Sequence, residues 1–408
     1  MIVNADGGRT GTFTSATGLG SFGHGIRAQV VYTSTQVQLL MAPGLLTPYA
    51  CGAPTGNQAS FMAAFDAAVL AGADLEALDA LYDLDADGLC RASDQLSGGI
   101  YAAAASVALD EERLVREAVT DRLRLAQDSG LAGIGAWGQL VGSWGHTNAD
   151  GNGFDFDNNR EGIIFGVDTG SESWRVGLVG HHIRTEIDAD ALASEAHIER
   201  TGAGAYAGFG SGPFRARIGA SYSDLEFEAL RTIAFPGFAG SAQGQADGSM
   251  IQGFGEIAYR FDAGDETYLE PFADLAVADL DLHPVNETGT AASRLRVEGQ
   301  DLDIGRAIVG MRGDMTIRTG GLRFRLGADA GLQHNFGDTD VVALIALDSA
   351  PDFPFAVGAT ELQPWAFVGG GRIALELGSN VTATLAYRGV YAGHSNDHAA
   401  SATIGIRF

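Results

Sequence analysis

The chain has 408 residues, a formal net charge of −26, 46% hydrophobic residues, 58 glycines and only 10 prolines. The hydrophobic share excludes a disordered chain, and the acidic balance argues against nucleic acid as a partner and against charge attraction to an anionic membrane surface. No run of residues approaches the ~20 apolar positions of a membrane-spanning helix. Residues 1–6 show no basic stretch followed by an apolar core, so we expect either a cytoplasmic protein or a piece of an exported one. The pattern of the remaining residues favours the exported piece.

Residues 1–50 contain short strand candidates among Gly and Ser turns, at 11–15, 28–32 and 37–41. So few residues cannot bury a core of their own. We therefore interpret them as the last rungs of a stacked repeat.

Residues 51–93 change to a pattern typical of helices. Apolar residues recur at helical spacing in two stretches separated by Gly72, namely Phe61, Phe65, Val69 and then Leu75, Leu78, Leu81. Cys51 and Cys90, which are the only cysteines, bracket these two short helices. In an exported protein we expect them to form a disulfide, and closing this loop would stabilise the fold by ~4 kcal/mol. Two buried free thiols are the alternative.

Residues 94–130 predict one long helix. Asp94 is a suitable N-cap, and nearly every residue from 100 to 108 is small, which suits a helix in a confined space. Its second half carries four arginines among acidic residues, and these are Arg113, Arg116, Arg122 and Arg124. A helix buried in a channel and a solvated helix with ion pairs one turn apart both remain open.

Residues 131–408 alternate apolar and polar side chains, which indicates strands between two different environments. In the last strand, Ile404, Ile406 and Phe408 share one face, opposite Thr403 and Arg407. We count about twelve such strands, many with aromatic residues at their ends. The predicted fold class is therefore all-β with a helical linker: an antiparallel transmembrane β-barrel of about twelve strands, with an α-helix in the pore.

The predicted connections between the strands alternate between short and long. The short turns are expected at 170–173, 210–213, 262–266, 319–321 and 378–380. The long polar loops are expected at 146–160, 188–196, 229–248, 284–299 and 337–360. Outer-membrane barrels have short periplasmic turns and long extracellular loops, so this alternation favours such a barrel. A diffusion porin, a barrel with a hydrolase site and a soluble β-sandwich are the alternatives.

Several segments, taken in their order along the chain, resemble the C-terminal part of a type Va autotransporter, a self-secreting protein of Gram-negative bacteria. The segments that carry the resemblance are GRTGTF (8–13), DQLSG (94–98), IYA (100–102), VREAVTDRLR (115–124), AWGQ (136–139), GSWG (142–145), AFPGF (234–238) and YLEPFADL (268–275). The resemblance implies four parts. They are a passenger remnant with terminal β-helix rungs (1–50), a short helical hairpin (51–93), a linker helix (94–130) and the autotransporter β-barrel (131–408).

The resemblance also implies a function and its partners. The barrel would insert in outer-membrane lipid as a monomer, with the help of periplasmic chaperones and the barrel assembly machinery. That machinery would read the C-terminal signal made by Ile404, Ile406 and Phe408. The barrel would export its own passenger segment to the cell surface, and the linker helix would then plug the pore. Some relatives cut themselves at asparagines in this helix, but residues 94–128 contain none, so we expect no cut there.

If the helix lies in the pore, its arginines need partners, because buried charges are costly when unpaired. The inward carboxylates Glu256, Glu270 and Asp329 are the candidates for Arg113, Arg116, Arg122 and Arg124.

Signals for metal binding and catalysis are weak. The first half of a calcium loop is present at Asp83, Asp85 and Asp87, but its last position would be Asp94 instead of a bidentate Glu. An acidic turn between helices explains these residues better. The sequence has no G-x-S-x-G, H-E-x-x-H or C-x-x-C pattern. We therefore expect transport without catalysis and without a cofactor.

Overall fold

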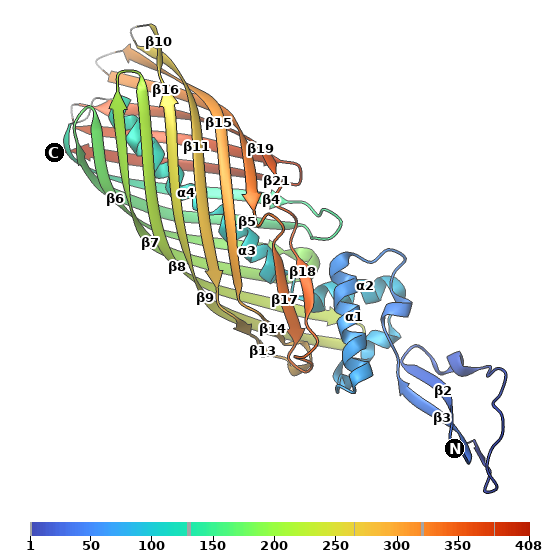
Figure 1. Ribbon diagram of the computed structural model, residues 1–408. Coiled ribbons are helices and arrows are strands. Elements are labelled where there is room, and N and C mark those ends of the chain that lie inside the picture. Colours follow the sequence, from blue (N-terminus) through green and yellow to red (C-terminus); the bar gives the residue numbers. More distant parts are fainter. Residues whose placement is uncertain (1, 129–131, 265, 320–321, 379) are drawn as a thin grey trace.

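A computed structural model describes residues 2–128, 132–264, 266–319, 322–378 and 380–408. Figure 1 shows a long barrel, helices that run inside it, and a group of short helices at one end, followed by a small sheet that carries the N-terminus. We call the end next to the short helices the module end. The opposite end, where the C-terminus lies, is the turn end.

Within the described residues, twelve long antiparallel strands form the barrel, as the alternation predicts. They are β4 (Gly133–Thr147), β5 (Phe156–Gly170), β6 (Trp174–Ala189), β7 (Ser194–Ser211), β8 (Phe214–Phe235), β9 (Phe238–Tyr259), β11 (Thr267–Leu282), β15 (Gln300–Thr319), β16 (Leu322–Gly337), β19 (Trp365–Leu377), β20 (Val381–Ala392) and β21 (Ser395–Arg407). Strand β9 pairs with β11, and the last strand β21 pairs with β4. These two pairings close the sheet.

The two faces of the barrel wall differ in polarity. Large apolar side chains point outward and are exposed, as for Val309 (67%), Leu385 (65%) and Leu178 (62%). The residues between them point inward, and many are buried arginines or carboxylates such as Arg312 and Asp168. This is the arrangement of a barrel with lipid outside and a polar lumen.

Two of the expected long loops are strands instead. Around 188–196, β6 runs to Ala189 and β7 begins at Ser194, with a short 3₁₀ turn η4 (Asp190–Leu192) between them. Within 229–248, β8 and β9 meet at Pro236 and Gly237. At these positions the strands continue to pair, although their outward side chains change from apolar to polar. A run of polar side chains looks like a loop in the sequence, so these two loop predictions are wrong. The turns expected at 262–266, 319–321 and 378–380 include positions outside the described residues.

Long connections at the module end contain shorter strands. Strands β12 (Val285–Asn286), β14 (Leu295–Val297), β17 (Val342–Leu347) and β18 (Phe355–Gly358) form a four-stranded antiparallel sheet, which we call the loop sheet. The 3₁₀ turn η5 (Ala291–Ser293) lies beside it. Strand β13 (Thr288–Gly289) pairs with β9. Strand β10 (Phe261–Gly264), at the turn end, pairs with β11.

The described part of residues 1–50 does not form β-helix rungs. Strands β1 (Val3–Asn4), β2 (Ile26–Tyr32) and β3 (Gln36–Pro43) make an antiparallel sheet in the order β1–β3–β2, next to a 3₁₀ turn η1 (Leu19–Phe22). A β-helix stacks parallel strands. The rung prediction is wrong because the short turn between β2 and β3 reverses the chain and gives antiparallel pairing.

Residues 46–97 form what we call the helical module. It contains η2 (Thr47–Tyr49), α1 (Gly56–Ala71), the 3₁₀ segment η3 (Glu76–Asp83) and α2 (Ala86–Ser97). Helix α1 begins with a capping box, in which Thr55 Oγ1 accepts from Gln58 N (3.2 Å) and Gln58 Oε1 accepts from Thr55 N (2.9 Å).

The expected single linker helix is divided. Asp94 lies inside α2, which ends at Gly98 with a φ of 75°. Helix α3 (Ile100–Asp110) then begins after Gly99, and α4 (Glu112–Asp128) continues it. The predicted start at Asp94 is wrong because a glycine with positive φ ends a helix there. The predicted boundary between 130 and 131 falls outside the described residues. None of the described helices is long and apolar enough to cross a membrane.

Candidate functional site

Helices α3 and α4 lie inside the barrel (Figure 1), and α4 brings charged side chains into the lumen. Arg113, Arg116, Arg122 and Arg124 are each at most 5% exposed. Buried charges destabilise a fold unless they are paired and hydrogen-bonded. All 25 basic residues of the chain are arginines. A guanidinium offers five donors, so one arginine can bind two carboxylates at once.

Each of these four arginines forms an ion pair with an inward carboxylate of the wall. The pairs join Arg113 to Asp397, Arg116 to Asp274 (2.6 Å), Arg122 to Asp168 (2.6 Å) and Arg124 to Asp314 (3.4 Å). The carboxylates come from β21, β11, β5 and β15. Helix α4 is therefore held from several sides of the barrel.

The carboxylates expected as partners face the lumen but contact other arginines. Glu256 and Glu270 pair with Arg312 (2.6 and 2.8 Å) and with Arg217, both on the wall. Arg217 in turn donates to Gln127 Oε1 of α4 (2.6 Å). Among the described residues, Glu256 and Glu270 therefore do not pair directly with the arginines of α4, and this prediction is wrong. Strand alternation shows whether a side chain points inward or outward, but not its position along the barrel axis.

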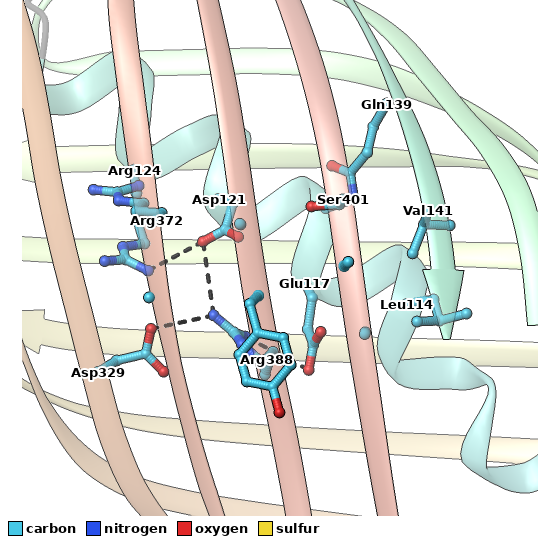
Figure 2. Close-up of a pocket in the computed structure, with 16 residues that line it drawn as sticks. Leu114, Glu117, Asp121, Arg124, Gln139, Val141, Asp329, Arg372, Arg388 and Ser401 are labelled. Carbon is cyan, nitrogen blue, oxygen red and sulfur yellow. Dashed lines mark hydrogen bonds and ion pairs between the residues drawn. The ribbon is translucent and has the colours of Figure 1, made fainter. Parts of the chain in front are cut away.

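Figure 2 shows how Asp329 reaches the helix. Arg388 of β20 lies between Asp329 (3.4 Å) and two carboxylates of α4, Glu117 (3.5 Å) and Asp121 (4.0 Å). The gap beside these residues has a volume of about 30 Å³. That is room for roughly one or two water molecules. At this level, α4 and the wall fill the lumen.

A second set of ion pairs was not predicted from the sequence. In these pairs the linker supplies the carboxylates and the barrel wall supplies the arginines. They join Asp110 to Arg160 (3.3 Å) and Arg306 (3.2 Å), Glu111 to Arg200 (3.6 Å), and Glu112 to Arg306 (2.6 Å). These pairs could have been anticipated from the arginines at inward positions of the predicted strands. At the other end of α4, Asp128 pairs with Arg325 (3.2 Å) and Arg372 (3.0 Å).

Asp168 shows how one buried carboxylate joins several elements. It accepts from Arg122 Nε (2.6 Å) and Nη2 (2.8 Å) and from Tyr206 Oη (2.9 Å), and it pairs with Arg175. Trp137 Nε1 donates to Tyr206 Oη (2.7 Å). This network connects α4 to the strands from β4 to β7.

In the helical module, Cys51 and Cys90 form a disulfide, 39 residues apart in sequence. It ties the segment before α1 to α2.

The four aspartates considered for calcium do not gather around one point. Asp85 caps α2 by accepting from Gly88 N (2.8 Å), while Asp94 accepts from Gln58 Nε2 of α1 (2.8 Å). Asp83 and Asp87 are exposed. Across the described ranges, no group of three or more His, Cys, Asp or Glu is arranged to hold a metal ion. Burial raises the pKa of Asp94 above its usual range, while the hydrogen bond from Gln58 opposes this shift.

The C-terminal residues lie on the outer face of the barrel. Ile404 (57%), Ile406 (40%) and Phe408 (77%) are exposed. Phe408 N donates to Ile134 O of β4 (3.0 Å), so the end of the chain lies at the junction of the last and first strands.

Residues 136–388 match the family model of the autotransporter beta-domain. Two curated relatives, both extracellular serine proteases of Serratia marcescens, are 27% identical over 329 and 327 residues, which is 78% of this chain. The chain spans only 31% of the length of these relatives.

Solved structures with a similar fold are translocator units of other autotransporters. The translocator domain of NalP from Neisseria meningitidis aligns with a TM-score of 0.61 and 16% identity, covering 75% of this chain and 98% of that one. The beta domain of Bordetella BrkA aligns with a TM-score of 0.52 and 14% identity, covering 68% and 100%. The family match covers more than half of the chain, and the twelve-stranded barrel agrees with it. This chain therefore belongs to the autotransporter family, and it is an outer-membrane translocator.

Proposed function

We propose that this translocator exports an N-terminal passenger to the cell surface and afterwards stays closed by its own linker. The filled lumen carries the proposal. Helix α4 is buried along the barrel axis, and its four central arginines are all paired with the wall. A diffusion porin needs an open aqueous channel, and this arrangement does not favour one.

The module end is the end that we place outside the cell. The long connections and the loop sheet lie there, and short turns such as those after Gly170 and Ser211 lie at the turn end. Outer-membrane barrels have their long loops outside and their short turns in the periplasm. Residues 2–97, which lie at the module end, would then be at the cell surface.

We further propose that the barrel assembly machinery recognises Ile404, Ile406 and Phe408, and that periplasmic chaperones and outer-membrane lipid are the other partners of this monomer. The exposure of all three side chains on the last strand supports this role. Phe408→Ser should reduce membrane insertion, measured by the gel band that shifts on boiling. Phe367→Ser, which changes another exposed aromatic residue, is the matched control. Normal insertion of the Phe408 variant would count against the signal.

The proposal gives this chain a transport role and no catalytic step. The serine protease name belongs to relatives that are roughly three times as long as the part this chain matches.

Single-channel conductance tests the closure. In one variant, a Gly/Ser linker of equal length replaces residues 94–128, which removes α3 and α4 but keeps the chain continuous. We expect its conductance to rise to that of an open barrel, because α3 and α4 are the helices that lie inside the barrel in the part of the chain that the structure describes. The control replaces residues 5–39, a segment of the same length outside the barrel. Equal conductance of both variants would contradict the proposal.

A further inference from the structure

The lumen has two zones of different chemistry. Towards the turn end, the arginines and carboxylates that pair with α4 lie beside a smaller apolar cluster, which includes Trp137, Ile164 and Val179. Towards the module end, buried apolar residues of seven strands form a larger core: Phe156, Ile187, Ala189, Ala196, Ile198, Leu225, Phe227, Ala229, Ile233, Met250, Ala278, Leu280, Leu302 and Ile304. An apolar inner face is unusual, because the lumen of such barrels is generally polar.

Helix α3 passes through this apolar zone, and its residues from Ile100 to Leu109 are all buried. The ring of Tyr101 packs against Phe227 of β8, with 5.7 Å between the centroids. A cavity of about 30 Å³ remains beside Ala104 and Ala108, lined mainly by apolar side chains. The small residues of α3 thus let the helix pack directly against the wall.

The same apolar core continues beyond the barrel. It includes Phe61 and Phe65 of α1, Leu96 of α2, and Leu295 and Phe355 of the loop sheet. Figure 1 shows β17 and β18 beside α1. We call this continuous core, from the apolar wall through α3 to the helical module, the apolar collar.

Specific hydrogen bonds dock the module on the loop sheet. Asn57 Nδ2 donates to Gly358 O (2.8 Å), and Gly358 N donates to Asn57 Oδ1 (2.8 Å). The rings of Phe61 and Phe355 meet edge to face, 5.5 Å apart. Ser60 Oγ accepts from Ala356 N (3.1 Å).

A buried ion pair fixes the bend where α2 meets α3. Arg231, with 0% exposure, binds Glu287 at 2.7 and 2.8 Å. Arg231 also donates to the last carbonyls of α2, at Gln95 (2.9 Å) and Leu96 (3.2 Å). Tyr101 Oη of α3 donates to Glu287 (2.7 Å). One charge pair therefore connects the wall, the loop region and both helices.

The border between the zones lies at the junction of α3 and α4. There the three consecutive carboxylates from Asp110 to Glu112 pair with the wall arginines Arg160, Arg200 and Arg306. Beyond this level, α4 is held both by ion pairs and by the smaller apolar cluster, which includes Leu114 and Val115 of the helix. The module side of the lumen holds the larger apolar core, and the α4 side combines ion pairs with the smaller one.

We propose that the apolar collar is a second closure of the pore, which holds the module end shut independently of α4. Ions do not enter an apolar constriction from which water is excluded. The charge pairs around α4 close the turn end, and the collar closes the module end. This inference rests on the proposed closure of the pore by its linker.

Four forms of the full chain test the collar by single-channel conductance. The first is the unchanged chain. In the second, a Gly/Ser linker replaces the 17 residues of α4, so the collar is kept. The third carries Ala104→Asp and Ala108→Asp, which place two unpaired charges in the collar and leave α4 unchanged. The fourth combines both changes.

The alanine substitutions have a matched control on α1. Ala63 and Ala67 have the same spacing but are exposed, so Ala63→Asp with Ala67→Asp adds the same charge without disturbing the collar. The gel band that shifts on boiling shows whether the barrel has folded. If the Ala104 variant does not fold, Phe61→Ala with Phe355→Ala replaces it, because both residues lie outside the barrel wall.

We expect the second and third forms to stay closed like the unchanged chain, and the fourth to conduct as an open barrel. If the second form alone conducts as much as the fourth, the collar is no closure, while closure by the linker still holds. If the fourth form is folded and stays closed, the collar proposal is wrong, while the variant that replaces residues 94–128 decides separately whether the linker closes the pore.

Discussion

A buried carboxylate in this lumen usually serves two arginines. Asp397 binds Arg113 of α4 and Arg160 of β5, and Asp168 binds Arg122 of α4 and Arg175 of β6. In each case one arginine belongs to the helix and one to the wall. Removing such a carboxylate therefore takes away a partner that the helix and the wall share.

This sharing gives a prediction for Asp168. Asp168→Ala should lower the free energy of unfolding by about 3–5 kcal/mol, since Arg122 and Arg175 stay buried and lose the carboxylate that they share. Urea unfolding of the detergent-folded protein measures this loss. The control is Asp352→Ala at an exposed position, for which we expect a change within about 0.5 kcal/mol. A similar small change for Asp168→Ala would show that the network contributes little.

Asp94 gives a prediction for pH. Burial raises its pKa in the folded state above the unfolded value, so the folded module binds more protons and loses stability as the pH rises from the unfolded pKa through the folded pKa. Asp94→Asn keeps an acceptor for Gln58 and removes the buried charge. We expect a helical module that is more stable at neutral pH and less sensitive to pH, measured by hydrogen exchange of α1 and α2. An unchanged pH dependence would contradict this account.

At the scale of elements, the turn between α2 and α3 depends on Gly98. Its φ of 75° is unfavourable for other residues, and an added Cβ would also clash with Leu295 Cδ1. Gly98→Ala should therefore cost at least about 1–2 kcal/mol of stability. Gly52→Ala is the control, because an added Cβ there meets nothing within 4 Å. Thermal unfolding compares the two variants, and an equal effect would refute the role of Gly98.

The disulfide gives a second prediction at this scale. Replacing Cys51 and Cys90 together by alanine should destabilise the helical module by ~4 kcal/mol, because the unfolded loop gains freedom. Hydrogen exchange of the amides in α1 and α2 should rise, while that of β8 should stay the same. A uniform rise in all elements would mean that the disulfide supports the whole barrel.

The sequence predicted the elements that repeat a simple pattern. Alternation predicted the wall and its outward apolar face, and small residues predicted a helix in a confined space. The bend after α2 was missed, although Gly98 and Gly99 are visible in the sequence. Alternation also could not show that β8 and β9 continue to Phe235 and Phe238, because polar outward residues look like a loop.

The partners of the buried charges could not be predicted from one strand at a time. Pairing depends on the relative heights of strands and helix, which follow from the register of the whole barrel. Glu256 and Glu270 were therefore recognised as inward carboxylates but assigned to the wrong arginines. The apolar collar was missed for the same reason, since its residues come from distant segments.

At the scale of the whole molecule, the chain is a wall with a lipid-facing exterior and a lumen filled by its own linker. Helix α4 is held by charge pairs and a small apolar cluster, and α3 is held by a larger apolar core. Such a lumen suits a translocator that has finished its export. The central claim is that the N-terminal part has crossed this barrel and lies outside the cell.

Labelling of epitope tags on intact cells tests this claim most directly. One tag is placed at Gly7, in the turn after β1, and the other at Gly212, in the turn between β7 and β8. We expect antibodies to label the first tag on intact cells and the second only after the outer membrane is permeabilised. Labelling of the Gly212 tag alone on intact cells, or of neither tag until permeabilisation, would contradict the account.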